Sequence, residues 1–74
     1  MKPTETYVGQ VKCTIIQIPD GLDEYGEHFQ VGDEIICDEI KYEHKGSEYV
    51  EYRWVVDPEY YFMPTEVDVL GNAD

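Results

Sequence analysis

Residues 48–56 read EYVEYRWVV, and this stretch decides the fold. Its side chains fall into two alternating sets, which are Val50, Tyr52, Trp54 and Val56 on one side and Tyr49, Glu51, Arg53 and Val55 on the other. A period of two residues is typical of a β-strand that buries one face. The stretch therefore predicts a strand whose first set of side chains lies in the core.

The preceding residues predict the strand that pairs with it. Residues 34–44, EIICDEIKYEH, form a second long strand in which Ile36, Ile40, Tyr42 and His44 have the same parity. Lys45-Gly46-Ser47 separates the two stretches, and glycine permits the positive φ that a tight hairpin turn requires. We therefore predict a β-hairpin over 34–56.

Further strands are expected on both sides of this hairpin. Residues 7–18 form a strand in which Val11, Cys13 and Ile15 face one side, and a change of phase predicts a bulge or bend near Ile15-Ile16. Residues 19–28 are predicted to be a loop because they are rich in glycine and acids. Short strands follow at 60–63 and 67–70. The predicted core comprises Val11, Cys13, Ile15, Ile36, Ile40, Val50, Tyr52, Trp54 and Val56.

The length and net charge of the chain limit the number of domains and the kinds of partner that can be expected. The chain has 74 residues, and we predict one domain over 1–74, with its core at about 7–70 and short tails at 1–6 and 71–74. Asp and Glu number 17 against 5 Lys and Arg, so the formal charge is −12. This charge argues against binding to nucleic acid or to an anionic membrane. No transmembrane run and no secretory signal are visible, so the cytoplasm is the expected compartment.

The sequence contains little that points to catalysis. His28 and His44 belong to no nucleophile or phosphate-binding motif, so we expect no enzyme activity and no cofactor. The acids of 20–24 fail the calcium-loop pattern because Leu22 replaces an Asp or Asn, so no metal site is predicted. Cys13 and Cys37 are expected to be buried thiols, with a disulfide or a redox role as the alternatives.

The acidic residues are segregated along the chain. Between residues 20 and 40 there are eight acids and no base, and between 57 and 74 there are five acids and no base. This surface is either a solubilising coat or an anionic face that binds a basic protein. The candidate partner-binding residues are Asp20, Asp23, Glu24, Glu27, Asp33, Glu34, Asp38, Glu39, Glu48, Glu51, Asp57 and Glu59.

A rigid β-scaffold can space carboxylates like phosphates. Alternate residues on one strand face stand about 6.6 Å apart, and duplex DNA carries one charge per roughly 1.7 Å of its axis. An acidic barrel can therefore occupy a DNA-binding groove. Exposed tyrosines, with Tyr25, Tyr49, Tyr60 and Tyr61 as candidates, would add apolar contact at such an interface.

The order of features resembles an SH3-like barrel. An acidic loop at 20–27 precedes Phe29-x-Val31-Gly32-Asp33-Glu34-Ile35, a hairpin leads to the strand with Trp54, and Met63-Pro64-Thr65-Glu66-Val67 is similar to the end of such domains. The expected fold is all-β, a small antiparallel SH3-like barrel of five or six short strands. The resemblance also implies an alternative function, a peptide-binding or adaptor module for a basic or Pro-rich segment, with Trp54, Tyr25 and Tyr60 as its groove.

In size and acidity the chain is similar to the small acidic proteins with which phages inhibit host DNA-binding proteins. This resemblance implies a non-catalytic DNA mimic in the host cytoplasm. We expect the chain to act as a monomer or homodimer. Its targets would be an HU-type nucleoid protein, RNA polymerase, or a restriction or repair enzyme. A structural or regulatory phage subunit is a third interpretation.

Overall fold

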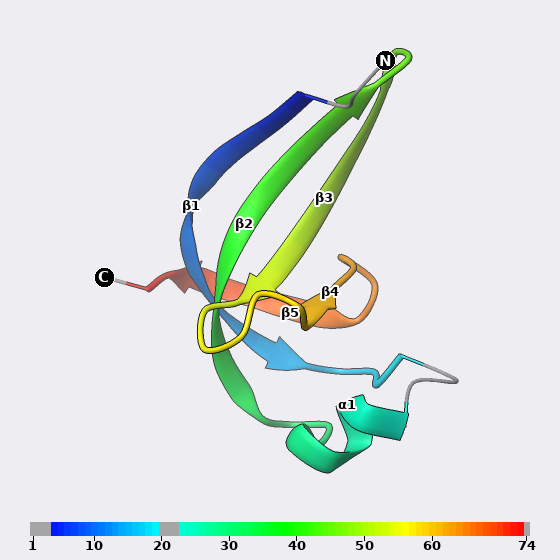
Figure 1. Ribbon diagram of the computed structural model, residues 1–74. Coiled ribbons are helices and arrows are strands. Elements are labelled where there is room, and N and C mark those ends of the chain that lie inside the picture. The colour runs from blue at the N-terminus through cyan, green and yellow to red at the C-terminus, as the bar shows by residue number, and fades with distance from the viewer. Residues whose placement is uncertain (1–3, 20–22, 74) are drawn as a thin grey trace.

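The fold is a curled, five-stranded antiparallel sheet in the order β4-β3-β2-β1-β5. It is described by a computed structural model that covers residues 4–19 and 23–73. Figure 1 shows the sheet curving into a half-barrel, with one short helix at the end of the molecule opposite the β2–β3 hairpin tip. The predicted fold class, a small antiparallel all-β barrel, is confirmed. The elements are β1 (Thr4–Ile15), α1 (Asp23–His28), β2 (Glu34–His44), β3 (Ser47–Trp54), β4 (Tyr61–Phe62) and β5 (Val67–Asn72).

The central hairpin forms as predicted. β2 pairs with β3 from Cys37↔Trp54 to His44↔Ser47. Lys45 and Gly46 turn the chain with φ values of 50° and 80°, which is the left-handed region that a two-residue hairpin turn uses. β3 ends at Trp54, so the expectation that Val56 lies in the core is wrong. Val56 lies in the bend after the strand and is 71% exposed.

The irregularities of β1 are not where the sequence predicted them. The register shifts between Tyr7 and Gly9 against β2, and between Lys12 and Cys13 against β5. The predicted bulge or bend at Ile15-Ile16 is instead the end of the strand. There the backbone N–H groups of Ile16 and Gln17 both donate to the carbonyl of Glu66, at 2.9 and 3.2 Å.

One face of the sheet carries the main core. Its centre includes the fully buried side chains of Cys13, Ile15, Cys37 and Phe62. Val50 and Trp54, two members of the predicted core, are partly buried and pack against it. The buried cluster comprises Val11, Cys13, Ile15, Tyr25, Phe29, Cys37, Tyr52, Phe62 and Val67.

The predicted core combined residues from two faces of the sheet, and this is corrected by the strand register. Ile40 lies opposite Glu51, whereas Tyr52 lies opposite Glu39. Directly opposed residues project to the same side of an antiparallel pair. Ile40, which is buried, and Ile36, which is half-buried, therefore lie on the other side of the sheet from Tyr52.

The predicted loop at 19–28 contains the helix α1, so that part of the prediction is wrong. Tyr25 and Phe29 stand four residues apart, the spacing that places two side chains on one helical face. The N–H of Phe29 donates to the carbonyl of Tyr25 at 2.9 Å. Both rings meet Phe62 edge-on, with centroids 5.5 and 5.1 Å away. Burial of these rings explains why an acidic, glycine-containing segment is helical here.

The two cysteines are buried free thiols, as predicted. The hydrogen-bonding interaction with Cys13 raises the pKa of the Cys37 thiol, and burial raises it further. Both sulfurs lie in the core, where Cys13 and Cys37 act as small apolar side chains.

Candidate acidic and aromatic binding surfaces

Acidic side chains from two segments converge on Tyr60. Glu24 and Glu27 are exposed on α1, and Asp57 lies in the turn after β3. Partial burial raises the pKa of Tyr60 above its ordinary value, and the charges of Glu24, Asp57 and Glu27 raise it further. We call Glu24, Glu27, Asp57 and Tyr60 the acidic patch. The fold therefore brings together members of both acid-rich blocks of the sequence.

Aromatic rings form the floor of this patch. The Tyr60 ring lies 5.0 Å from His28, 5.1 Å from Tyr25 and 6.0 Å from Trp54, measured between ring centroids. Trp54 is half-buried and meets Phe29 edge-on at 4.8 Å. The structure thus brings together Trp54, Tyr25 and Tyr60, the three rings that the SH3-like resemblance assigned to a peptide groove. Tyr25 is buried, however, so the expectation that it is an exposed contact residue is wrong.

Several predicted partner-binding acids are engaged elsewhere. Lys12 pairs with Glu34 at 3.6 Å, and Lys41 pairs with Glu48 at 3.7 Å. All four of these side chains are about half exposed, and exposed pairs of this kind contribute only ~0–1 kcal/mol to stability. Asp33 accepts the backbone N–H of Gln30 at 2.9 Å and shapes the turn before β2.

The remaining candidate acids do not share one face. Asp38 and Glu39 are consecutive on β2, so they project to opposite sides; Asp38 lies opposite Arg53, and Glu39 lies opposite Tyr52. Glu59 is exposed and lies next to Tyr60 in the sequence. Its backbone N–H donates to Asp57 Oδ1 at 3.1 Å. Asp20 lies outside the described residues, and Asp23 is described only as the first residue of α1.

Arg53 organises a network on the face opposite α1. Its guanidinium donates to Glu5 Oε1 at 2.8 Å, to Glu51 Oε2 at 3.1 Å and to the Tyr42 hydroxyl. The Tyr42 hydroxyl in turn donates to Glu51 Oε2 at 2.6 Å. Burial raises the pKa of Glu51 above its ordinary value, and the charge of Glu5 adds to this rise. Glu51, a predicted partner-binding acid, is therefore part of an internal network.

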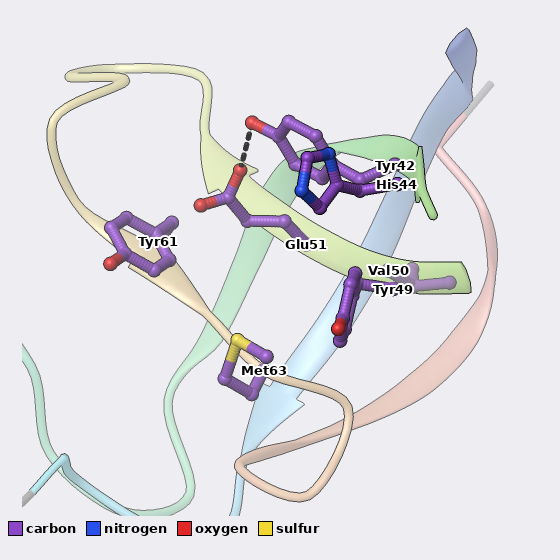
Figure 2. A pocket seen from close by; sticks show the side chains of 7 residues that line it. All are labelled: Tyr42, His44, Tyr49, Val50, Glu51, Tyr61 and Met63. Atoms are coloured by element: carbon purple, nitrogen blue, oxygen red, sulfur yellow. Dashed lines mark hydrogen bonds between the residues drawn. The ribbon is translucent and has the colours of Figure 1, made fainter. Parts of the chain in front are cut away.

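A hollow of about 330 Å³ opens beside this network. Figure 2 shows it bordered by side chains from β2, β3 and the segment around β4. Sequence analysis missed this site, although it expected Tyr49 and Tyr61 to be exposed, as they are. The sequence signal that could have indicated the hollow is that Tyr42 and His44 have the same parity on β2. The register places them on the same side of the sheet as Tyr49 and Glu51 of β3. Its lining residues are Tyr42, His44, Tyr49, Val50, Glu51, Tyr61 and Met63.

Within residues 4–19 and 23–73, no group of three or more His, Cys, Asp or Glu side chains is placed to hold a metal ion. No described helix is long and apolar enough to cross a membrane. The chain matches no family model, no curated protein and no solved structure.

Proposed function

We propose that this is an acidic, non-catalytic protein that binds a basic surface of a host protein and there takes the place of DNA. The observation that carries the proposal is the acidic patch. Glu24 and Glu27 on α1, and Asp57 after β3, act on one hydroxyl, that of Tyr60. A cationic group of a partner would be attracted to these like charges.

The distribution of bases supports this choice of surface. Lys12, Lys41 and Arg53 are paired with acids on the strands, and none of the ion pairs between described residues involves the acidic patch. Lys45 lies at the hairpin tip, at the other end of the molecule from α1 (Figure 1). No described base is thus paired with an acid of the patch, so the negative charge there would steer a basic partner.

The aromatic floor of the patch favours a protein as the partner. Protein interfaces are enriched in aromatic residues, and Tyr60 and half-buried Trp54 offer such contacts within the patch. A folded scaffold also presents its carboxylates without the entropy cost of ordering a flexible acidic tail. The partner class is a basic DNA-binding protein of the host cytoplasm, such as an HU-type nucleoid protein, RNA polymerase, or a restriction or repair enzyme.

One observation favours a second function. Trp54, Tyr60 and His28 lie together beside three carboxylates, and this arrangement suits a Pro-rich segment that carries a basic residue. A peptide-binding or adaptor module would use the same patch. The two functions differ in the competitor that displaces the partner, which is duplex DNA for the mimic and a Pro-rich peptide for the module.

The test compares two double charge reversals. The first, Glu24→Lys with Glu27→Lys, reverses the α1 side of the acidic patch. The control, Glu43→Lys with Asp68→Lys, makes the same change in net charge at exposed strand positions outside it. Titration of a basic HU-type protein by calorimetry should show a loss of about tenfold or more in affinity for the first variant only.

Equal losses in the two variants would mean that overall charge binds the partner without a patch. No loss in either variant would mean that the acids are a solubilising coat. Each of these outcomes contradicts the proposal.

A further inference from the structure

The hollow beside β3 is separate from the acidic patch. Tyr60 and Tyr61 are consecutive, and only Tyr60 joins the aromatic floor next to α1. Tyr61 lies opposite Arg53, on the face of the sheet that carries the Arg53 network. An inference about the hollow therefore does not depend on the proposed function.

The hollow combines aromatic faces with a carboxylate. Tyr42, Tyr49 and Tyr61 contribute three phenol rings, and Met63 contributes a thioether. Aromatic faces attract cations because the ring quadrupole is negative above the plane. Arg53 illustrates this within the molecule, since its guanidinium lies 5.6 Å from the centre of the Tyr42 ring.

The carboxylate of Glu51 has one engaged oxygen and one open oxygen. Tyr42 and Arg53 both donate to Oε2. These hydrogen bonds, and the ion pair with Arg53, use Oε2 and not Oε1. Figure 2 shows the bond from Tyr42 to one oxygen of Glu51, with the second oxygen directed away from Tyr42. Because Glu5 and Glu51 share one guanidinium, the network retains a net charge of about −1 beside the hollow.

We infer that the hollow binds the side chain of a lysine presented by a protein partner, with its ammonium group donating to Glu51 Oε1. The apolar lining fits the four-carbon stem of lysine, which lies along apolar surface while its charged end finds an acceptor. The volume of about 330 Å³ is at the lower end of ligand-site sizes, as expected for one side chain.

Lysine fits this site better than arginine does. A guanidinium binds a carboxylate most strongly through two parallel hydrogen bonds, one to each oxygen. Oε2 of Glu51 is already used twice, so only a single acceptor is open. An ammonium group is a compact charge and needs only one such acceptor, with aromatic rings around it.

The test uses short blocked peptides in which glycines surround one lysine, one arginine or one norleucine. Binding is followed by the NMR resonances of the tyrosine rings and backbone amides. The lysine peptide should shift resonances of Tyr49 and Tyr61 in a saturable way and bind at least about tenfold more tightly than the neutral norleucine peptide.

Two variants locate the effect in the hollow. Glu51→Gln removes the charge. Tyr61→Ala removes an exposed ring that makes none of the hydrogen bonds of the Arg53 network, so at least one of the two variants should retain the native fold. Each should weaken lysine binding about fivefold or more. Asp68→Asn and Val56→Ala are the matched controls for lost charge and lost exposed apolar surface, and they should leave it unchanged.

Three results would overturn the inference. They are equal binding of the norleucine peptide, tighter binding of the arginine peptide, and no saturable shift with the lysine peptide. The proposed function is tested separately, because reversal of Glu24 and Glu27 should not alter lysine-peptide binding in the hollow.

Discussion

Tyr42 and Glu51 are joined across β2 and β3 by a 2.6 Å hydrogen bond in which the phenol donates to Oε2. Arg53 donates to the same carboxylate oxygen and to the Tyr42 hydroxyl. The bond therefore connects a charge network to an aromatic wall of the hollow. It fixes the orientation of Glu51, whose side chain is only 14% exposed.

Replacement of Arg53 should destabilise the fold, because Arg53 is the cation that pairs with both Glu5 and Glu51. Arg53→Met leaves Glu51 with less compensation in a partly buried position, and should lower the free energy of unfolding by about 1–3 kcal/mol. Adding Glu51→Gln should restore part of that loss because the uncompensated charge is gone. Urea unfolding of the four proteins of the double-mutant cycle measures this coupling, and strictly additive losses would contradict it.

Alkaline stability should depend on Tyr25. Burial raises the pKa of its phenol, which bonds both the carbonyl and the N–H of Tyr61, at 3.1 and 3.0 Å. In the unfolded chain a tyrosine ionises near its ordinary pKa of about 10. The stabilising contribution is therefore complete below about pH 10 and is lost as the pH rises through the higher folded value.

Tyr25→Phe provides the comparison for this alkaline loss. The variant should be about 1–2 kcal/mol less stable at neutral pH because the bonds to Tyr61 are lost. Above pH ~10 its free energy of unfolding should fall less steeply than that of the wild type. Chemical unfolding at a series of pH values measures both effects. Parallel pH profiles would show that Tyr25 does not titrate differently in the folded state.

Phe62 should dominate the stability of the core. Its side chain is fully buried and meets the rings of Tyr25 and Phe29 edge-on. Phe62→Ala should therefore cost about 3–5 kcal/mol, enough to unfold much of so small a domain. Val56→Ala, at a site that is 71% exposed, should change stability by less than about 0.5 kcal/mol. Thermal melts that rank these variants in the reverse order would contradict the core described here.

Added salt should stabilise the fold. With 17 acids against 5 bases, repulsion between like charges exceeds the effect of the few exposed ion pairs. Raising ionic strength from about 10 to about 150 mM shortens the screening length to ~8 Å and should raise the melting temperature. Glu24→Gln with Glu27→Gln should reduce the salt dependence. A melting temperature that does not change with salt would show that the carboxylates are too far apart to repel.

Local patterns predicted the strands, but not how they align. The alternation at 48–56 and the glycine at the hairpin tip placed β2 and β3 correctly, because both signals depend on neighbouring residues alone. Which side chains of β2 lie on the same side of the sheet as the buried side chains of β3 depends on the register. Register is a relation between strands, and a shift of one residue exchanges the two faces. Ile40 and Tyr52 were assigned to one core for this reason.

The acidic patch and the hollow also depend on contacts between elements that are separate in the sequence. The acids on both sides of Tyr60 were identified as candidates, but their convergence depends on α1, which exists because Tyr25 and Phe29 are buried. Tertiary burial outweighed the loop-like composition of that segment. The hollow was missed because its rings come from β2, β3 and β4, and nothing in one strand reveals the side chains of another.

We propose above that the acidic patch takes the place of DNA on a basic host protein. The most direct test is a competition titration of an HU-type nucleoid protein that already holds a labelled DNA duplex. The account predicts that the wild-type chain displaces the duplex, that displacement weakens steeply as salt rises, and that Glu24→Lys with Glu27→Lys abolishes it while Glu43→Lys with Asp68→Lys does not. Failure of the wild-type chain to displace DNA at low salt, or displacement by the patch-reversed variant at wild-type strength, would contradict it.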